Sequence, residues 1–431
     1  MTFEEAKAKL LSRQDYVKKD GLSRVYACLG KLGNPQFKLK TVHVTGTNGK
    51  GSVCALFEAC ARAAGLKTGL FTSPHLVCMT ERIRVDGVSV RPETFASLFE
   101  EALAAGPDLT FFELLTCMAF LHFAREGVQL AVIEVGIGGR WDTTNVLVKP
   151  ELSVITSVDF DHMKYLGATL AEIASQKAGI IKQGGVCLAP VLQPEARAEV
   201  SREAGEKDAQ CHFFAPEFEI VSRDWEHNRM TLRHRKTGET LPFGILGEAQ
   251  VSNATLVWEG LAIMRGLGWP ITKEHAAAGF AAARWPARFQ VAKAGPEFGG
   301  AVFVVDGAHN AEAARAFARN WKASPFHSRP SAFVVGILQD KERRCILESL
   351  APLCGRFVLT SPGTPRAADP CALADELAAI RPDADAEVQQ DIGAALRSAA
   401  SSGTVAVLGS FYLAGAALEL LGAEGIPAAG R

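Results

Sequence analysis

A glycine-rich stretch near the start of the chain contains the residues of a phosphate-binding loop. In "TVHVTGTNGKGSVCALF" (41–57), Gly49 and Lys50 follow the usual nucleotide-binding order, but Gly51 separates Lys50 from Ser52. Backbone N–H groups in such a loop can wrap an anion at the start of a helix. We expect Lys50 to neutralise phosphate oxygens and Ser52 to lie close to a metal ion. The alternative is an ordinary glycine-rich turn between a strand and a helix.

Acidic side chains and a histidine follow two later strands. "LAVIEVGIGGRWDTTNV" places Glu134 in a buried strand, where a lone carboxylate is costly unless it is paired or bound to metal. "TSVDFDHMKYLG" puts Asp161 and His162 at the end of the next strand. Since magnesium ligands can be gathered from successive strand ends of a parallel sheet, these residues are candidates for one metal site. A helix-capping or core role for His162 is equally compatible with its position.

Short β-branched runs alternate with longer helical patterns, and these elements must position the candidate residues. Apolar strands joined by helices are typical of a parallel sheet covered on both faces. We therefore predict an α/β fold with an N-terminal P-loop-type parallel-sheet domain and a smaller, Rossmann-like α/β domain after it. The predicted strands lie in "KTVHVTG", "KTGLFTS", "LAVIEVG" and "LSVITSV", and then in "AVFVVDGAHN", "SAFVVGILQD", "RFVLTSP" and "TVAVLGS".

A Pro- and Gly-rich segment separates the two sets of strands. "ARWPARFQVAKAGPEFGG" (283–300) is the best candidate for an interdomain linker. We expect the first domain to span residues 1–290 and the second to span 297–431. Residues 211–245 mix charged and aromatic residues and predict a short antiparallel excursion from the first domain.

The composition is that of an ordinary globular protein. Of 431 residues, 48% are hydrophobic and 22% are charged, and the net charge of -1 gives no global attraction for nucleic acid or membrane. "MTFEEAKAKLL" predicts a helix and is unlike a signal peptide, so we expect a cytoplasmic protein. The ten cysteines include no C-x-x-C pair, which favours reduced, buried thiols over disulfides or zinc.

Eight stretches, taken in order, resemble the folylpolyglutamate synthase and dihydrofolate synthase family within the Mur ligase superfamily. They are "GTNGKGS", "TSPHL", "ERIRVDG", "EVGIGGRWDTTN", "DHMKYLG", "QKAGIIK", "RWPARFQ" and "DGAHN". The resemblance runs from about residue 20 to about residue 415. It also accounts for the unusual loop, since G-T-x-G-K-G-S/T is similar to the Mur ligase form of the phosphate cradle.

The resemblance implies an ATP-dependent amide ligase of folate biosynthesis. A carboxylate of dihydropteroate, or of a folate's glutamate tail, would attack the γ-phosphate to give an acyl phosphate and ADP. The amino group of L-glutamate would then displace phosphate. Two anions must meet in line, so positive charge has to be concentrated around the γ-phosphate. The first domain would be the Mur-ligase-type ATP-binding domain and the second the glutamate-ligase domain, in a monomer that acts only on small molecules.

The resemblance also implies the residues of the ATP and metal sites. Lys50, Lys177 and His162 would be catalytic, and two magnesium ions would be held by Ser73, Glu134, His162 and Lys177 as a carbamate. By spacing alone Lys177 is more typical of a solvated helix lysine, and the resemblance reverses that reading. The residues expected to bind ATP are Thr47, Asn48, Gly49, Lys50, Gly51, Ser52, Asn253, Arg288, Asp306 and His309.

Three positions depart from the family pattern. Gln176 stands before Lys177 where the family more often has Glu, and Ala249 stands where it often has His. Ala287 replaces a usual Gly beside Arg288, and alanine there could stiffen a hinge that normally has the freedom of glycine.

The pterin-binding positions are implied by weaker matches. "KDGLSRV", "TFFE" and "WDT" occupy the corresponding places. Phe111 and Phe112 are equally compatible with the hydrophobic core. The full set is Asp20, Gly21, Leu22, Thr110, Phe111, Phe112, Glu113, Trp141, Asp142 and Thr143.

Two other protein classes share part of this pattern. A peptidoglycan Mur ligase would have the same ATP site, but it would carry a uridine-nucleotide domain ahead of the loop, where only about forty residues stand here. A P-loop ATPase acting as a switch or motor needs only the cradle and one acidic residue. A switch would not explain Lys177 or "DGAHN".

Overall fold

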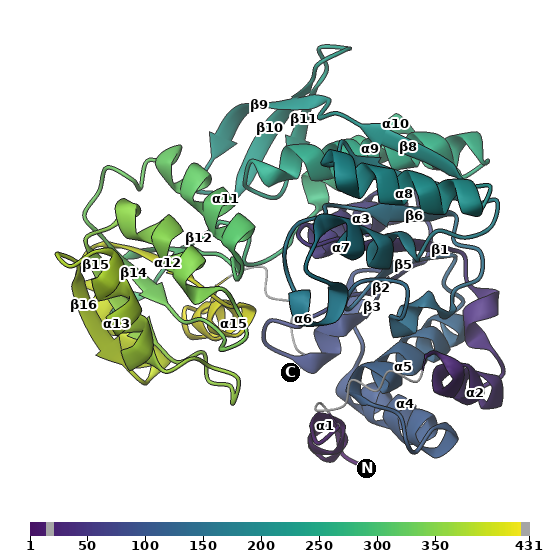
Figure 1. Ribbon diagram of the computed structural model, residues 1–431, viewed down its shortest axis with the longest axis horizontal. Coiled ribbons are helices and arrows are strands. Elements are labelled where there is room, and N and C mark those ends of the chain that lie inside the picture. The colour runs from purple at the N-terminus through teal and green to yellow at the C-terminus, as the bar shows by residue number, and fades with distance from the viewer. Residues whose placement is uncertain (14–20, 424–431) are drawn as a thin grey trace.

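The computed structural model describes residues 1–13 and 21–423 and contains two α/β sheets and one small antiparallel sheet (Figure 1). In the figure the first sheet lies on the right with its helices, the second lies on the left, and the small sheet lies at the top. Asp20, predicted above to bind pterin, is outside the described residues.

The first sheet has eight strands. They are β1 (Thr41–Thr45), β2 (Thr68–Phe71), β3 (Ile83–Val85), β4 (Val88–Ser89), β5 (Leu130–Glu134), β6 (Leu152–Ile155), β7 (Val186–Pro190) and β8 (Gln210–Phe214). Their order is β4-β3-β2-β5-β1-β6-β7-β8, in which β3 and β4 form an antiparallel edge and the remaining pairs are parallel. The four strands predicted for the first domain are confirmed as β1, β2, β5 and β6.

Helices cover both faces of the first sheet. They are α1 (Phe3–Leu11), α2 (Ser23–Lys31), α3 (Lys50–Ala63), α4 (Pro92–Ala105), α5 (Phe111–Arg125), α6 (Met163–Leu166), α7 (Leu170–Ala178), α8 (Pro194–Glu206), α9 (Ala249–Gly266) and α10 (Lys273–Ala282). Successive residues of β5 enter opposite cores, as expected for a strand that is buried on both sides. Leu130 and Val132 pack with α3, α9 and α10, whereas Ala131 and Ile133 pack with α1, α2, α4 and α5.

The antiparallel excursion predicted for residues 211–245 is confirmed for most of its length. The small sheet consists of β9 (Phe218–Asp224), β10 (Arg229–His234) and β11 (Thr240–Phe243), in the order β11-β10-β9. Residues 211–214 differ from the prediction because they belong to β8, which pairs in parallel with β7 at the edge of the first sheet.

The second sheet has six strands in the order β12-β13-β17-β14-β15-β16. They are β12 (Gln290–Lys293), β13 (Val302–Val305), β14 (Ser331–Val335), β15 (Arg356–Thr360), β16 (Asp385–Gln389) and β17 (Thr404–Leu408). The four strands predicted for this region are confirmed. β12 lies inside the segment predicted as a linker and pairs antiparallel with β13, so the second sheet begins at Gln290.

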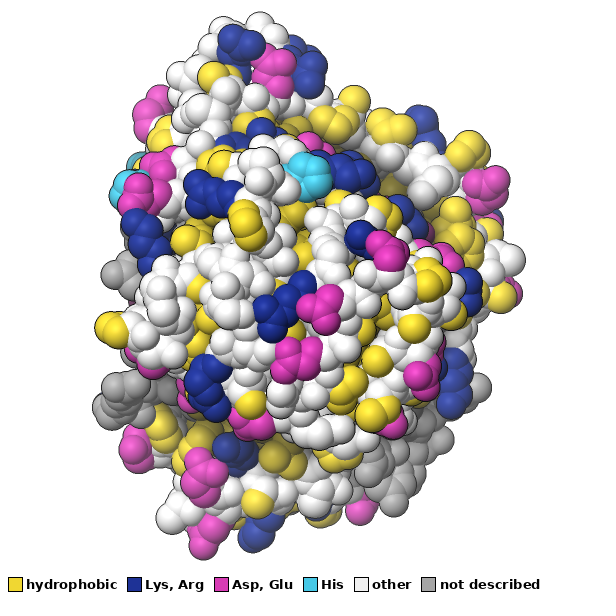
Figure 2. Space-filling model, turned by 90° about the vertical axis from the view of Figure 1, so that its left-hand side faces the viewer, with side chains coloured by type: hydrophobic (Ala, Val, Ile, Leu, Met, Phe, Trp, Pro, Cys, Tyr) yellow, Lys and Arg dark blue, Asp and Glu magenta, His cyan; other side chains and the backbone are white. Residues whose placement is uncertain are grey.

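Helices α11 (Ala311–Lys322), α12 (Arg343–Leu350) and α13 (Pro370–Ile380) cover one face of the second sheet, and α14 (Ile392–Ala400) and α15 (Phe411–Leu420) cover the other. The outward surface on this side mixes basic and acidic side chains, in keeping with the near-zero net charge (Figure 2). Short 3-10 helices occur at η1 (Pro35–Lys38), η2 (Met79–Arg82), η3 (Thr143–Val146), η4 (Pro296–Phe298) and η5 (Ala351–Leu353).

All ten cysteines are free thiols, and six of them are buried, as the sequence predicts. They pack as small hydrophobic side chains. Among residues 1–13 and 21–423, none of the helices combines the length and the apolar character needed to cross a membrane.

The contact between α3 and α10 generates a prediction about stability. A Cβ atom added to Gly279 would lie 2.5 Å from Cys60 Cα, which is backbone and cannot swing away. Gly279→Ala should therefore lower the free energy of unfolding by about 1–3 kcal/mol through overpacking. Thermal unfolding would measure the change.

Gly205→Ala is the matched control, because Gly205 lies in α8 and an added Cβ atom would meet nothing within 4 Å. That variant should be neutral or more stable by roughly 0.5–1 kcal/mol, since alanine is the better helix former. Equal effects of the two substitutions would contradict the close helix contact.

Candidate active site

The phosphate loop connects β1 to α3 as the sequence predicts. Lys50 is the first residue of α3, and its Nζ donates to the carbonyl oxygens of Gly46 and Thr47 at 3.0 and 3.1 Å. The ammonium group therefore lies inside the loop whose backbone would surround a phosphate. Thr47 and Asn48 are held from the next strand end, since their backbone N–H groups donate to Ser157 O at 3.0 Å and Ser157 Oγ at 2.9 Å.

Three glycines are required by the geometry of this loop. Gly46 and Gly49 have φ values of +154° and +86°, and Cβ atoms at these positions would collide with Thr156 and Asn253. At Gly51 a Cβ atom would lie 2.8 Å from the Trp285 ring. The inserted glycine after Lys50 thus lets Trp285 lie against the first turn of α3. The contact of Gly49 with Asn253 also brings this predicted ATP ligand from α9 to the loop.

Ser52 and Glu134 have the burial and chemistry of metal ligands. The Ser52 hydroxyl is fully buried and has no hydrogen-bond partner among residues 1–13 and 21–423. Glu134, at the end of β5, is 3% exposed and accepts a hydrogen bond from Ser73 N–H at 2.9 Å. Burial raises the pKa of Glu134 to about 7, against the opposing effect of Lys50. A divalent cation would compensate the buried carboxylate and give the serine hydroxyl a partner, so these residues fit magnesium.

His162, the predicted metal ligand before α6, has an unusual backbone conformation. It precedes α6 with φ 50° and ψ 33°, in the left-handed region. Burial and, next, the charge of Lys341 lower the pKa of His162 to about 4, so the imidazole is neutral at pH 7. A neutral ring nitrogen is the form that binds a metal ion.

Lys177 lies in the last turn of α7 and is 2% exposed. Within the described part of the chain, its Nζ has no hydrogen bond or ion pair. Burial, followed by repulsion from Lys50, lowers the pKa of Lys177 well below its usual value. The sequence spacing alone favours a solvated lysine, and that interpretation is wrong. The departure at Gln176 does not alter the helix, and the Gln176 carbonyl accepts a hydrogen bond from Arg140 N–H.

The second sheet contributes Arg288, Asp306 and His309 from the loops at its β12 and β13 edge. Asp306 follows β13, and its carboxylate accepts hydrogen bonds from Phe289 N–H at 2.7 Å and Ala308 N–H at 2.8 Å. Burial raises the pKa of Asp306 despite the charge of Arg288. The guanidinium of Arg288 lies 4.9 Å from the centre of the Phe411 ring. Burial lowers the pKa of Arg288, and the negative charges of Asp306 and then Glu134 oppose this shift. The Arg288 guanidinium therefore interacts electrostatically with a carboxylate of each sheet domain.

Ala287 has a conformation that explains why glycine is usual at this place. Its φ is +55°, in the left-handed region, and the residue is fully buried. An alanine in that region costs of order 1 kcal/mol relative to glycine. The departure therefore strains the segment that connects the two sheets. Ala249, the other departure, is the exposed first residue of α9.

A buried polar network joins the two sheets at this site. Asn310 caps α11, and its Nδ2 donates to Asn48 Oδ1 at 3.0 Å and to Asp161 Oδ2 at 3.1 Å. Lys341 Nζ contacts Asp161 Oδ1 at 2.7 Å, and both side chains are less than a tenth exposed. Burial alone would raise the pKa of Asp161, but His162 and Lys341 together lower it well below its usual range.

Sequence reasoning missed Asn310 and Lys341. Asn310 ends the quoted motif "DGAHN" and could have been found as a helix cap, because Asn before an Ala-rich run is a typical N-cap. Lys341 lies in a loop after β14 and carries no recognisable spacing signal.

The predicted pterin residues separate into structural and accessible positions. Thr110 and Glu113 form a capping box at the start of α5, and Glu113 also contacts Arg24 of α2 at 2.9 Å. Asp142 is buried, and its carboxylate accepts hydrogen bonds from the N–H groups of Ile137 and Thr144 at 3.0 Å. These contacts fix local structure whether or not a pterin is bound.

Among the remaining pterin positions, Gly21 and Trp141 lie close together. Gly21 approaches Trp141, whose ring is 67% exposed, since a Cβ atom on Gly21 would lie 3.9 Å from Trp141 Cζ3. Phe112 is half-buried against Phe71, with ring centres 5.7 Å apart, while Phe111 is buried beneath the Arg82 guanidinium. Leu22 immediately precedes α2, and Thr143 Oγ1 lies 2.6 Å from Thr116 Oγ1 on α5.

The fold and the site together define a nucleotide-dependent ligase of the Mur type. Residues 44–259 match the Mur ligase middle domain, and residues 287–411 match the Mur ligase glutamate ligase domain. Dihydrofolate synthase/folylpolyglutamate synthase of Mycobacterium tuberculosis is 35% identical over 384 residues, which cover 82% of this chain and 76% of that protein. This chain belongs to the folylpolyglutamate synthase and dihydrofolate synthase family of Mur ligases.

Solved structures agree with this assignment. The folylpolyglutamate synthase of Mycobacterium tuberculosis, complexed with ADP and AMPPCP, superposes with a TM-score of 0.86 at 30% identity over 98% of both chains. The Escherichia coli FolC structure, in complex with DHPP and ADP, gives a TM-score of 0.83 at 28% identity over 98% of both chains.

The buried ion pair between Lys341 and Asp161 generates a prediction. Lys341→Met should lower the free energy of unfolding by about 3–5 kcal/mol, because it leaves the Asp161 carboxylate buried without its cation. The pKa of Asp161 is lowered in the folded protein, so this pair stabilises fully above about pH 4, the unfolded value for aspartate. The difference from the unmodified protein should shrink in more acidic solution, as Asp161 becomes protonated.

Arg366→Met is the control, because Arg366 pairs with Asp340 at 2.9 Å on the surface nearby. That exposed pair should contribute only about 0–1 kcal/mol. Thermal unfolding from pH 3 to pH 8 would measure both variants. A loss at Lys341 no larger than that at Arg366 would show that the network does not hold the sheets together.

Proposed function

We propose that this protein uses ATP to join L-glutamate to dihydropteroate and to the glutamate tails of folates, as a bifunctional enzyme of folate biosynthesis. The Mycobacterium tuberculosis relative is named for both activities, and the Escherichia coli structure holds DHPP and ADP. We assign ATP binding and activation to residues 1–290 and the contribution of the glutamate-ligase domain to residues 297–431. The cytoplasmic, monomeric state expected from the sequence is part of this proposal.

One observation carries the proposal: the phosphate loop is hydrogen-bonded to the second sheet. Asn48 within the loop contacts Asn310 directly, and Asp161 contacts both Asn310 and Lys341. A ligase needs its nucleotide and its second substrate in one site that both domains build, whereas a switch or motor needs only the first sheet. The arrangement therefore supports acyl transfer between the domains over simple ATP hydrolysis.

In the proposed reaction, the acceptor carboxylate attacks the γ-phosphate and forms an acyl phosphate with release of ADP. The amino group of L-glutamate then attacks the acyl carbon, and the tetrahedral intermediate expels phosphate as the amine loses its proton. Lys50 would exchange its two carbonyl partners for phosphate oxygens. Arg288 would add positive charge from the second sheet. Such fixed charges stabilise the phosphoryl-transfer transition state most strongly in a site from which water is excluded.

Ser52, Ser73, Glu134 and His162 are the residues that would hold magnesium. The metal would offset the charge of the phosphate oxygens and keep them aligned for attack. Glu134 and Ser52 fit this role best, since one is a buried carboxylate and the other a buried hydroxyl that no described residue hydrogen-bonds.

We also propose that carbon dioxide carbamylates Lys177. The support is that Lys177 is buried, that its Nζ has no partner among the described residues, and that burial lowers its pKa, which favours the neutral amine that reacts with carbon dioxide. A carbamate would place at this position an anion able to bind a second magnesium ion. The charge of Lys50, which disfavours the Lys177 ammonium, would favour the carbamate.

The activity test supplies ATP, magnesium and L-glutamate together with either dihydropteroate or tetrahydrofolate. We expect products heavier by one glutamate residue from both acceptors, separable by mass, and phosphate release that depends on both the acceptor and glutamate. Phosphate release without an acceptor would instead indicate a switch, and ligation only to a uridine-linked muropeptide would indicate a peptidoglycan enzyme.

Lys50→Ala should abolish both ligations while the protein stays folded. The substitution removes one charge from a preformed phosphate site, which should lower turnover by roughly 10²-fold or more. Lys38→Ala, at an exposed lysine of η1, is the control and should keep full turnover. Near-normal turnover of Lys50→Ala would show that the phosphate site lies elsewhere.

Lys177→Ala should be nearly inactive and partly rescued by acetate, which can supply the missing carboxylate in the vacated space. Lys177→Arg should stay inactive with acetate, because it keeps the bulk and the positive charge. Circular dichroism would confirm that both variants are folded. Intact mass measured on active, bicarbonate-equilibrated enzyme checks the modification directly, and an unmodified Lys177 in that sample would remove the carbamate from the mechanism.

A further inference from the structure

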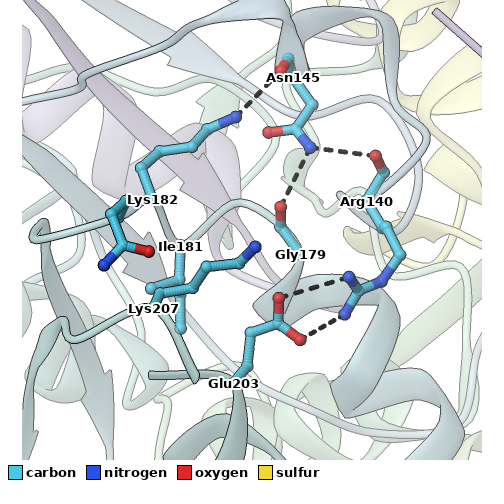
Figure 3. Close-up of a pocket in the computed structure, with 8 residues that line it drawn as sticks. Arg140, Asn145, Gly179, Ile181, Lys182, Glu203 and Lys207 are labelled. Carbon is cyan, nitrogen blue, oxygen red and sulfur yellow. Dashed lines mark hydrogen bonds and ion pairs between the residues drawn. The ribbon is translucent and has the colours of Figure 1, made fainter. Parts of the chain in front are cut away.

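A polar pocket separate from the candidate active site lies on the first domain, beside the C-terminal end of α7. Its volume is about 280 Å³. Figure 3 shows its side chains, which come from the loop after β5, the segment after α7 and the end of α8. No predicted ATP, metal or pterin residue lines it. The lining residues are Arg140, Asn145, Gly179, Ile181, Lys182, Gln183, Glu203 and Lys207.

The pocket carries an excess of positive charge. Arg140 and Glu203 neutralise each other through a paired contact, with Arg140 Nη2 at 2.6 Å from Glu203 Oε2. Lys182 Nζ donates only to the backbone oxygen of Asn145, at 3.0 Å, and Lys207 has no side-chain partner in the described ranges. Burial lowers the pKa of Lys182 to about 8, and Lys207 contributes to the shift, as expected for two close ammonium groups without a counter-ion.

Asn145 adds an unpaired hydrogen-bond acceptor to the same pocket. Its side chain is nine-tenths buried, and its Nδ2 donates to the carbonyl oxygens of Arg140 and Gly179, both at 3.0 Å. These two acceptors fix the orientation of the amide, because only the nitrogen can donate. Asn145 Oδ1 is buried and has no hydrogen-bond partner in the part of the chain that the structure describes. Figure 3 shows it directed toward the side of the pocket where Lys182 lies.

We propose that this pocket binds free phosphate, an anion that retains a proton at neutral pH. The ammonium groups of Lys182 and Lys207 would neutralise the phosphate oxygens. The P–OH group would donate to Asn145 Oδ1 and so give this buried acceptor, which has no partner among the described residues, a hydrogen bond. Cations and an acceptor together select for an anion that is also a hydrogen-bond donor.

Sulfate is the informative comparison. It has the same shape as hydrogen phosphate and the same charge, but at neutral pH it has no proton to donate. Sulfate would leave Asn145 Oδ1 unpaired, and an unsatisfied buried acceptor costs about 1–3 kcal/mol, which is about 5- to 150-fold in affinity. Asn145 would therefore make the pocket bind phosphate more tightly than sulfate, whereas Lys182 and Lys207 would attract either anion.

Calorimetric titration would test the proposal with the phosphate loop blocked. Full-length protein saturated with magnesium and AMPPCP is titrated with inorganic phosphate, glycerol phosphate or sulfate at constant ionic strength. Lys207→Gln removes one ammonium group and should weaken phosphate binding at least about tenfold, the range of a charge-assisted hydrogen bond. Lys322→Gln is the matched control, because Lys322 also lies at the C-terminal end of a helix, α11, and is exposed outside the pocket.

We expect phosphate to bind the Lys322→Gln variant as tightly as the unmodified protein and the Lys207→Gln variant more weakly. Sulfate should bind more weakly than phosphate. Glycerol phosphate has lost most of its second proton at neutral pH, so it should bind more weakly than free phosphate, and equally tight binding would overturn the role of Asn145. Absence of phosphate binding, or equal binding by the two variants, would overturn the site. Sulfate binding as tight as phosphate would overturn the role of Asn145.

Discussion

Burial of charge where the two sheets meet is the constraint on which the rest of the structure depends. Lys50, Glu134, Lys177 and Arg288 carry ionisable groups into a region from which water is largely excluded. A single buried charge costs several kcal/mol unless other groups compensate it. Here carboxylates, cations and backbone dipoles compensate one another only in part. Substrates that bring phosphate and carboxylate groups would compensate the remaining charge.

The loop geometry follows from that constraint. Gly46 and Thr47 turn their carbonyl oxygens toward the Lys50 ammonium group, which therefore has hydrogen-bond acceptors in the absence of phosphate. A phosphate would offer the Lys50 ammonium group charged acceptors in place of neutral carbonyl oxygens, so that both the donor and the acceptor would be ionised. Phosphate binding therefore replaces weaker contacts with stronger ones and leaves the loop in place, so little reorganisation opposes it.

The sequence predicted the elements and chemistry of each sheet better than the contacts between the sheets. Apolar strands and the glycines of the loop carry local signals, so β1, α3 and the position of Lys50 could be placed from sequence. Contacts such as Asp161 with Lys341 join residues 180 positions apart, and their spacing contains no information about the pairing. Lys177 shows the same limit, because its helix was predictable, but its burial depends on how α7 packs against the sheet.

Asn48 couples the phosphate loop to the second sheet. It belongs to the phosphate loop, yet its side chain exchanges hydrogen bonds with Asn310 of the second sheet. Any movement of the loop around a nucleotide must keep, shift or break this contact, and Asp161 lies on the far side of the same asparagine. Ala287 adds strain to the connecting segment at φ +55°, where glycine would be relaxed. A nucleotide that favours one arrangement of Asn48 therefore also favours one arrangement of the two sheets. Binding at the phosphate loop and the position of the second sheet are thus coupled.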